Sequence, residues 1–392
     1  MYDITIIGAG PAGSTLARLI AKTHKVLLID KRQAGSDAKC CGGLLAPDAQ
    51  QMLATLGLGL PKSVLSEPQL FVVRAIDLPK HLEQYYQRHY INIDRLKFDQ
   101  WLISLIPSGV DIRTGSAFQS YEKDGAGFRV RFDRNNQTCT EQTRIIIGAD
   151  GAGSRVRRMA FPNEPPPKTY TAIQEWFEVN PVRKTTDEDK SNDSHPERSE
   201  GSQRFFATTQ NDCGQFSNGA SKSLPYFSSI FDSEVTDFYS WIIPKEDSIM
   251  LGSAIYPQKK SFAKFELLKK KLADYGFKFG RSIKKRGTLL FRPISTGQIY
   301  LGQGNIGLIG EAAGFISPSS AEGLSYAFRS ALALAQALQT RPDNFLKPYH
   351  ANTSCLRTNI RLKNLKSNFM YRPFLRRAIM RSGLNSIKIN KD

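Results

Sequence analysis

The sequence predicts an α/β protein with an added β domain: a Rossmann-like domain interleaved with an antiparallel sheet domain and followed by a basic helical C-terminus. Three observations lead to this prediction. Residues 2–32 have the pattern of a strand, a glycine-rich turn, a helix and a second strand. Two later apolar segments, 144–158 and 305–338, also run into glycine-rich turns. Between them, residues 236–244 carry large apolar side chains at alternate positions, as one face of a sheet does.

The composition is that of a globular protein with a real core. The chain has 392 residues, of which 40% are hydrophobic, enough for one two-lobed protein or two to three domains. No apolar run reaches about 18 residues, so no membrane-spanning helix is expected. Residues 1–10 read as a first strand, because they lack the basic stretch and cleavage site of a leader. The five cysteines have neither disulfide-framework nor metal-ligand spacing, so we expect no metal and a cytoplasmic location.

The first glycine-rich turn has the spacing of a dinucleotide-binding fingerprint. Gly8 allows the tight turn, Gly10 lets the backbone approach a pyrophosphate, and Gly13 allows close packing of helix on strand. The pyrophosphate would lie at the helix N-terminus, where free N–H groups favour negative charge. The second strand ends at an acid suited to ribose hydroxyls. The expected contacts here also include the neighbours Pro11, Ala12, Asp30 and Lys31.

The two later glycine-rich segments resemble the further flavin fingerprints of the para-hydroxybenzoate hydroxylase-like flavoproteins, which implies FAD as the cofactor. In that family an acid of the last fingerprint binds the flavin ribityl chain, and the helix that follows points its N-terminus at the flavin ring, where its dipole favours the anionic reduced form. Glu311 stands where the family usually has Asp. The resemblance also implies FAD contacts for Arg95, in an R-x-x-F-D pattern, and for the strand at Ala117. The implied fingerprint residues are Asp150, Gly151, Gly310, Glu311, Gly314, Pro318, Gly323 and Leu324.

A C-G-G element follows the second strand and resembles that of the geranylgeranyl reductase branch of these flavoproteins. The matching residues are Cys41, Gly42 and Gly43. In that branch the element lies beside the flavin, so the paired glycines would let the backbone approach the ring and Cys41 could contact flavin or substrate. The alternative is a glycine-rich turn with a bystander thiol.

The segment YSWIIP resembles a second motif of the same branch, P-x-x-Y-x-W-x-F-P, which lines a cavity for a long isoprenoid chain. Tyr239, Trp241 and Pro244 match this motif, and Ile243 replaces Phe. Alternate residues of a strand share a face, so Tyr239, Trp241 and Ile243 would project together toward an apolar substrate. The alternative is that they pack a core between sheets.

The resemblance is closest to one bacterial flavoprotein group of this branch, which shares Glu311, and it covers nearly the whole chain. The exception is a polar, charged stretch at 181–223, which we expect to be a disordered insert. The expected domain boundaries are FAD-binding parts at 1–75, 93–165 and 291–340, a substrate-lobe strand at 76–92, a substrate-binding sheet at 166–290 and a basic helical region at 341–392.

Three functions are compatible with these motifs. The first is reduction of carbon–carbon double bonds in an isoprenoid or other lipid, with Cys41 and Tyr239 as candidate proton donors. The second is a monooxygenase or a halogenase, for which Lys80 is the candidate tunnel lysine. The third is a non-catalytic flavin- and lipid-binding module. No second dinucleotide fingerprint is evident, so the electron donor is expected to be a separate, unidentified partner.

The formal net charge of +18 indicates an anionic partner. From 344 to 391 there is no acidic residue, while Lys and Arg alternate with apolar residues at helical spacing. An anionic membrane surface is the expected partner, with peripheral attachment at the inner face of the cell membrane. The alternative is that these apolar residues pack on the core. No nucleic-acid-binding motif accompanies the charge, so nucleic acid is not expected.

Overall fold

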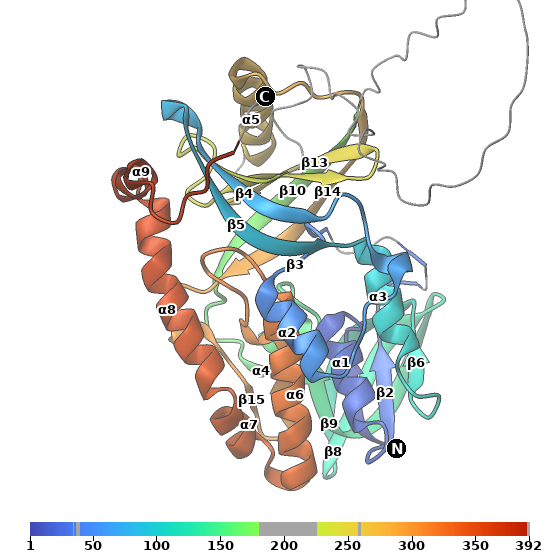
Figure 1. Cartoon of the computed structure of the whole chain (residues 1–392). Helices are drawn as coiled ribbons and strands as arrows, with labels where there is room; N and C mark the ends of the chain where they lie inside the picture. The colour runs from blue at the N-terminus through green and yellow to red at the C-terminus, as the bar shows by residue number, and fades with distance from the viewer. Residues whose placement is uncertain (34, 37–39, 180–225, 258–259, 390–392) are drawn as a thin grey trace, which may run out of the picture.

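A computed structural model describes residues 1–33, 35–36, 40–179, 226–257 and 260–389 (Figure 1). The insert expected at 181–223 lies outside these residues. The described chain forms two sheets of eight strands each, one above the other in Figure 1.

The lower sheet is built on a parallel core. Its main path runs β15-β16-β9-β1-β2-β6, and β8 joins β7 to the side of β9. Strand β1 lies between β2 and β9, parallel to both, and its isoleucines are buried, as expected for a strand covered on both faces. The strands are β1 (Tyr2–Ile7), β2 (Val26–Ile29), β6 (Asp111–Arg113), β7 (Ser116–Asp124), β8 (Gly127–Arg134), β9 (Gln137–Gly148), β15 (Gly302–Gln303) and β16 (Ile306–Leu308).

The upper sheet is antiparallel except for the pair β11–β4. Its order is β14-β10-β13-β12-β11-β4-β5-β3. One face packs under helix α5, while the opposite face turns toward the lower sheet. The strands are β3 (Leu44–Leu45), β4 (Leu70–Asp77), β5 (Leu82–Asn92), β10 (Lys168–Glu178), β11 (Phe227–Phe231), β12 (Ser240–Lys245), β13 (Ser248–Ile255) and β14 (Ser282–Arg292).

The chain passes several times between the sheets. Strand β4 of the upper sheet already begins at Leu70, six residues before the expected change at 76. The chain returns to the lower lobe with α3 at Arg95, enters the upper sheet again at Lys168, and leaves it after Arg292. Each crossing brings a strand end or loop to the space between the sheets, where the site lies.

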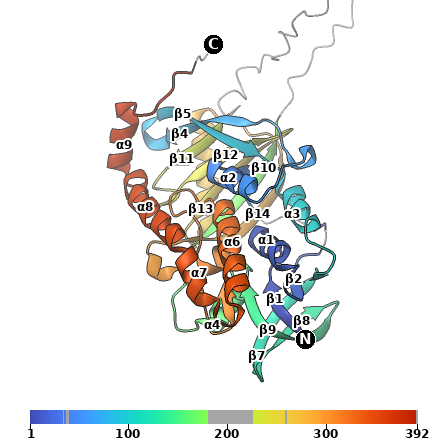
Figure 2. The ribbon, with the colours of Figure 1, turned by 60° about the horizontal axis from the view of Figure 1, so that its bottom comes forward.

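Helices surround the lower sheet and connect the two lobes (Figure 2). Helix α1 follows the first glycine-rich turn, with Pro11 in its first turn, where the missing N–H costs no hydrogen bond. Helices α1 and α6 share the apolar core of the lower sheet. The helices are α1 (Pro11–Ile20), α2 (Pro47–Thr55), α3 (Arg95–Ser104), α4 (Arg155–Ala160), α5 (Ser261–Tyr275), α6 (Leu324–Thr340), α7 (Leu346–Asn352), α8 (Ser354–Tyr371) and α9 (Pro373–Ser382). Short 3₁₀ turns include η2 (Leu78–Lys80) and η4 (Gly310–Ala313).

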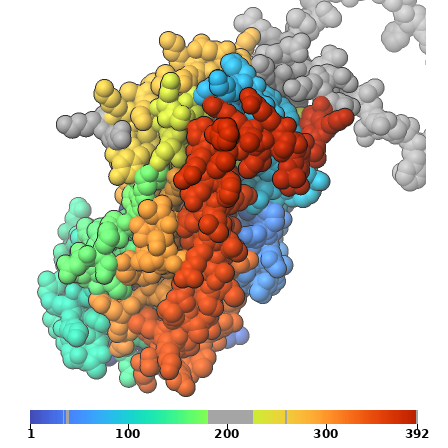
Figure 3. Space-filling model, turned by 90° about the vertical axis from the view of Figure 1, so that its left-hand side faces the viewer, coloured from blue at the N-terminus to red at the C-terminus, as the bar shows by residue number. Residues whose placement is uncertain are grey.

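The C-terminal helices run along one side of the molecule. Figure 3 shows them as a continuous orange-to-red band that extends from the lower lobe to the upper sheet. Their end is tied to the upper sheet by Asp77, whose fully buried carboxylate accepts from Arg376 at 2.7 Å and from Arg377 at 3.0 Å. Removing one partner of such a buried pair typically costs about 3–5 kcal/mol, so α9 is held firmly on β4.

Among the described helices, none combines the length and the apolar composition that crossing a membrane requires.

Candidate functional site

A cavity of about 1120 Å³ lies between the two sheets and receives residues from both. Ligand pockets of about 300–1,000 Å³ are common, so this one offers room for more than one small ligand. Most of the residues expected from the sequence line it. These are Gly8, Gly10, Pro11, Ala12, Asp30, Lys31, Cys41, Gly42, Gly43, Arg95, Ala117, Asp150, Gly151, Tyr239, Trp241, Ile243, Gly310, Glu311, Gly323 and Leu324.

The first glycine-rich turn forms a backbone cradle at the lower end of the cavity. Gly8 has φ +109°, and an added Cβ would lie 2.6 Å from the carbonyl oxygen of Ala149, so only glycine fits. At Gly10 an added Cβ would meet no protein atom within 4 Å, although the residue lines the cavity. The open space beside Gly10 and the N-terminus of α1 is therefore shaped for an anionic group close to the backbone.

Asp30 ends β2 at the edge of this cradle. Its carboxylate accepts from the backbone N of Ala9 at 2.6 Å and forms an ion pair with Arg32 at 3.1 Å. Arg32 also contacts Asp99 at 3.2 Å. The expected ribose acid is thus present in the cavity wall and oriented by these partners.

Arg95 connects this network to the C-G-G element. Its Nε donates to Asp99 at 2.8 Å, and the thiol of Cys41 also interacts with the guanidinium. Burial lowers the pKa of Arg95, but Asp99 and then Cys41 outweigh this effect, so its pKa is raised. Arg95 therefore stays charged in the cavity wall and holds Cys41 beside the cradle.

Asp150 contributes a buried polar atom to the cavity wall. Its Oδ2 accepts from the backbone N of Arg155 at 2.7 Å, whereas Oδ1 has no partner among the described residues. Burial raises the pKa of this carboxyl group. A buried acceptor without a partner is costly unless a ligand supplies a donor. Together with the open space at Gly10, Asp150 shows that the cavity fits FAD, whose hydroxyl groups are such donors.

Glu311 lies in the wall of the cavity, and it also makes a contact that the sequence did not predict. Its Oε1 accepts from the backbone N of Phe291 at 3.0 Å, which ties η4 to the end of β14. The longer side chain, compared with the usual Asp, reaches across to the upper sheet.

Two predicted glycines lie outside the cavity lining. An added Cβ at Gly13 would lie 1.9 Å from the carbonyl oxygen of Gly8, so Gly13 serves the packing of α1 on the turn. At Gly314, φ is +91° and an added Cβ would lie 2.9 Å from the carbonyl oxygen of Gln298. Both glycines shape the backbone instead of facing the cavity.

Two predicted prolines also lie outside the lining, and each presents its carbonyl to a neighbouring element. Pro318 accepts from Arg292 Nε at 3.1 Å and from Ser367 Oγ at 3.3 Å. Pro244 accepts from Asn92 Nδ2 at 3.0 Å. Pro244 points away because it alternates with Trp241 and Ile243 along β12.

The upper end of the cavity is an aromatic wall. Tyr239, Trp241 and Ile243 face it from β12 and the residue before it, whereas Ile242 packs beneath α5 on the opposite face. The indole of Trp241 lies flat on Gly252 of β13, where a Cβ would approach within 2.2 Å of the ring. The indole Nε1 is buried without a partner among the described residues. This wall suits an apolar ligand with few polar groups.

The hydroxyl of Tyr239 is already engaged. It donates to the carbonyl oxygen of Ser320 at 2.7 Å, and burial, with a smaller effect of Tyr90, raises its pKa. Tyr239 is therefore a wall residue whose proton is held by the loop before α6, which weighs against the proton-donor role expected for it.

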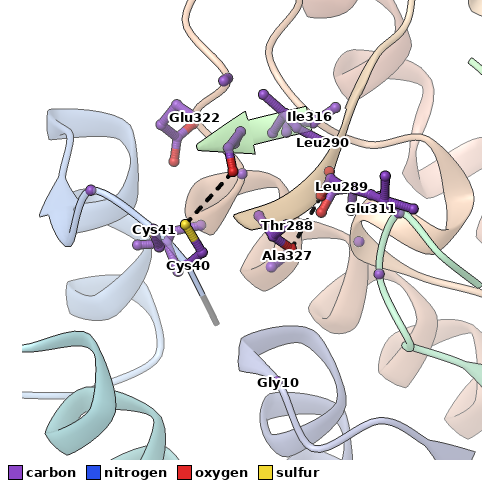
Figure 4. Close-up of a pocket in the computed structure, with 18 of the residues that line it drawn as sticks. Gly10, Cys40, Cys41, Thr288, Leu289, Leu290, Glu311, Ile316, Glu322 and Ala327 are labelled. Carbon is purple, nitrogen blue, oxygen red and sulfur yellow. Dashed lines mark hydrogen bonds between the residues drawn. The ribbon is translucent and has the colours of Figure 1, made fainter. Parts of the chain in front are cut away.

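The adjacent thiol of Cys40, for which no role was predicted, also lies in the cavity. Cys40 Sγ donates to Gln174 Oε1 of β10 at 2.8 Å. Figure 4 shows Cys40 and Cys41 on one side of the space, opposite Thr288 and Glu311. No local pattern in the sequence indicates this contact, since Gln174 is 134 residues away.

Lys245 lies behind the C-G-G element and was also missed. Its ammonium donates to the carbonyl oxygens of Gly43 at 3.1 Å and Ile93 at 2.9 Å, and it contacts Asn92. Burial lowers the pKa of Lys245 to about 7. This lysine fixes the backbone of Gly43 against β5.

Lys80, the candidate lysine of the halogenase hypothesis, lies elsewhere. It is exposed in η2, beside Phe374 and Arg377 of α9. Three other lysines, Lys31, Lys363 and Lys366, line the cavity. Within the described ranges, no group of three His, Cys, Asp or Glu residues is arranged to hold a metal ion.

Comparisons with known proteins agree with this geometry. A family described as FAD binding domain matches residues 1–210. The protein CbrA of Escherichia coli O9:H4 is 38% identical, over 100% of this chain and 96% of its own length. The protein CbrA of Shigella dysenteriae serotype 1 is 37% identical, over 100% and 99%.

Solved structures share the fold. A geranylgeranyl bacteriochlorophyll reductase-like protein from Thermoplasma acidophilum has a TM-score of 0.73 and 20% identity, over 95% of this chain and 87% of its own. PqsL of Pseudomonas aeruginosa, a probable FAD-dependent monooxygenase, has a TM-score of 0.63 and 14% identity, over 98% and 100%. The flavin-dependent halogenase CmlS has a TM-score of 0.66 and 16% identity, over 100% and 68%. At these identities the structures establish the fold alone, whereas the sequence matches go further: the chain binds FAD and belongs to the CbrA family of FAD-dependent oxidoreductases.

Proposed function

We propose that this protein is an FAD-dependent reductase of carbon–carbon double bonds in an isoprenoid or other lipid. The observation that carries the proposal is the continuity of the cavity, whose lining joins the cradle at Gly10 to the aromatic wall at Trp241. The structural likeness to a geranylgeranyl reductase-like protein supports it. An apolar chain on the aromatic wall would present a double bond beside the C-G-G element.

The reaction needs two hydrogens at the double bond. Reduced FAD supplies a hydride to one alkene carbon, and a proton must reach the other; an unidentified electron donor then reduces the cofactor again. Cys41 is the proposed proton donor, because it lines the cavity and is held by Arg95 and by the backbone N of Gly43, 3.5 Å from its sulfur. Burial of the aromatic wall would exclude water from the alkene.

The test is an anaerobic mixing experiment. The FAD-loaded protein is reduced with dithionite, freed of excess reductant and mixed with a polyprenyl lipid, while the flavin absorbance is followed. We expect the lipid alone to reoxidise the flavin and to gain two hydrogens by mass spectrometry. Cys41→Ala should slow this reoxidation, whereas Cys355→Ala, at an exposed thiol of α8, should not.

Other outcomes would identify the alternatives. Reoxidation only by oxygen, with a hydroxylated or halogenated product, would replace the reductase by an oxidative enzyme. Unchanged reduced flavin in the presence of lipids that demonstrably bind would favour a non-catalytic lipid-binding module.

We also propose that α8 and α9 attach the protein peripherally to an anionic membrane, the source of its lipid. On α8, Leu362, Leu365 and Phe369 share one face and are 60%, 61% and 51% exposed. Phe374 of α9 is exposed as well. Basic residues accompany this apolar stripe, and each adds about 1 kcal/mol of attraction near an anionic surface. Arg376 and Arg377 are occupied by Asp77 and are not available for this attraction.

Vesicle flotation tests the attachment. We expect binding to phosphatidylglycerol vesicles, little binding to phosphatidylcholine vesicles, and release as salt rises. The double variant Leu365→Ser, Phe369→Ser should lose binding, while Phe262→Ser, at an equally exposed site on α5, should keep it. Equal binding to both vesicle types would refute an electrostatic anchor.

A further inference from the structure

Three cations converge on the cavity at a distance from the glycine-rich cradle. Strand β5 faces the cavity with alternate residues, Tyr86, Arg88 and Tyr90. Helix α8 faces it with Lys363 and Lys366, three positions apart on one side of the helix. The cationic cluster of Arg88, Lys363 and Lys366 is thus built by two elements that lie far apart in the sequence.

The positive charge of this cluster is only partly balanced. The Nζ atom of Lys363 lies 3.5 Å from Oδ2 of Asp48, but within the described residues neither Arg88 nor Lys366 forms an ion pair. The carboxylate of Glu322 also lines the cavity, but it accepts from the backbone N and the hydroxyl of Ser325 at 2.8 Å each and forms no ion pair with the cluster among the described residues.

The chemistry of the individual groups also favours an anionic ligand. Arg88 stacks on the ring of Tyr90, and its Nε is buried without a hydrogen-bond partner in the described part of the chain. Lys366 is exposed to solvent along part of its side chain, yet the protein around its ammonium, and then the charges of Arg88 and Lys363, lower its pKa. Like charges held together in this way repel one another unless a ligand neutralises them.

The position of the cluster separates it from the cofactor cradle. Asn92 pairs with Leu44, next to the C-G-G element, and Arg88 is four residues farther along β5. At a strand rise of about 3.3 Å per residue, Arg88 lies about 13 Å from that point. The cradle at Gly10 belongs to the lower lobe, whereas β5 belongs to the upper sheet, as Figure 1 shows.

We propose that the cavity binds an amphiphile whose phosphate or diphosphate group is held by Arg88, Lys363 and Lys366. Guanidinium and ammonium groups form their strongest hydrogen bonds with such oxyanions. The attached apolar chain would then run past Tyr90 to the aromatic wall and the C-G-G element. This inference rests on the proposed lipid substrate and adds its head group to it.

Equilibrium binding to the oxidised, FAD-loaded protein tests the proposal without catalysis. Three probes are titrated by calorimetry: geranylgeranyl diphosphate, geranylgeraniol and inorganic diphosphate. We expect the prenyl diphosphate to bind about tenfold or more tightly than the alcohol, because charge-assisted hydrogen bonds typically contribute this much. Inorganic diphosphate should bind more weakly than the prenyl diphosphate, since it lacks the chain.

Variants locate the effect. The double change Arg88→Gln, Lys366→Gln should remove the preference for the diphosphate and leave binding of the alcohol unchanged. Lys366→Arg should keep the preference, because it keeps the charge. Lys347→Gln, at an exposed site of α7 in the same basic region, should behave as the unaltered protein.

Equal binding of alcohol and diphosphate, or undiminished preference in the double variant, would overturn the head-group site. Inorganic diphosphate binding as tightly as its prenyl ester would also overturn it, in favour of a free anion. These outcomes are independent of turnover. A protein that prefers the diphosphate but does not reduce it keeps the head-group site and loses the proposed reductase activity.

Discussion

The two ends of the cavity are built in different ways. At the lower end the wall is mainly backbone: Gly8 and Gly10 bring the main chain to the cavity beside the N-terminus of α1. At the upper end the wall consists of side chains, with Trp241 from β12, Arg88 from β5 and Lys366 from α8. The lower end therefore suits a ligand of one fixed shape, whereas the ligand preference of the upper end depends on individual side chains.

This difference separates cofactor from substrate. A glycine turn binds through backbone N–H groups, which every residue except proline carries, so its specificity comes from the path of the backbone. An aromatic and cationic wall binds through the shape, polarity and charge of its side chains. Changes at the lower end should abolish FAD binding, and changes at the upper end should alter which lipid binds.

The largest expected effect is at Gly10. A valine there would place its side chain in the open space beside the N-terminus of α1, where we expect the FAD pyrophosphate. Gly10→Val should therefore give a colourless, folded protein that retains its circular dichroism spectrum. A yellow protein with its full complement of FAD would show that the cradle does not hold the cofactor.

Gly109→Val is the matched control. An added Cβ at this exposed glycine also meets no atom within 4 Å, but Gly109 is not part of the cavity. We expect this variant to keep its FAD, so loss of colour in both proteins would point to a general effect of valine on folding.

The same contrast explains what could be predicted from the sequence. The cradle was predicted in detail because Gly8, Gly10 and Gly13 lie within six residues of one another and their spacing has a direct geometric meaning. The cationic cluster was missed because Arg88 and Lys366 are brought together only by the packing of α8 along the upper sheet. Many other basic residues surround Lys366, and nothing in the sequence around Arg88 points to α8, so no pattern marks these two.

At other positions a local motif was identified correctly in the sequence, but the role of its residue depends on tertiary contacts. The alternation in β12 correctly brought Tyr239 and Trp241 to one face. The hydrogen bond from Tyr239 to Ser320, 81 residues away, is not visible in that alternation, and it favours a wall role for Tyr239 over the expected proton-donor role. The same holds for Glu311, whose bond to Phe291 depends on how β14 ends beside η4.

A smaller effect is expected at Trp241. Trp241→Ala should weaken binding of geranylgeraniol while the FAD content stays near normal, because the indole lines only the upper end. Loss of a buried Trp typically costs about 3–5 kcal/mol of stability, so the measurement is made well below the melting temperature of the variant. If the protein instead loses FAD together with its fold, the role of Trp241 is packing.

Trp176→Ala separates the two effects. Trp176 of β10 is partly buried against the same apolar cluster but does not line the cavity. The Trp176→Ala substitution should lower the stability of the protein without changing its affinity for the lipid. Equal losses of lipid affinity in both variants would contradict the assignment of the wall to Trp241.

The smallest expected effect concerns Lys245, at the junction of the two ends. Its pKa is lowered by burial from 10.5 to about 7, so between these values the unfolded chain holds a proton that the folded chain has released. When the unfolded state binds more protons, the free energy of unfolding rises with pH. Lys245 should therefore make the protein less stable below about pH 7 and contribute rising stability from there toward pH 10. The measurement is urea unfolding at a series of pH values for the protein and for Lys245→Met, since the difference between the two removes the contributions of all other groups. Identical pH slopes would mean that the ammonium keeps its ordinary pKa, and that the backbone of Gly43 is held by a lysine charged at every pH where the cavity works.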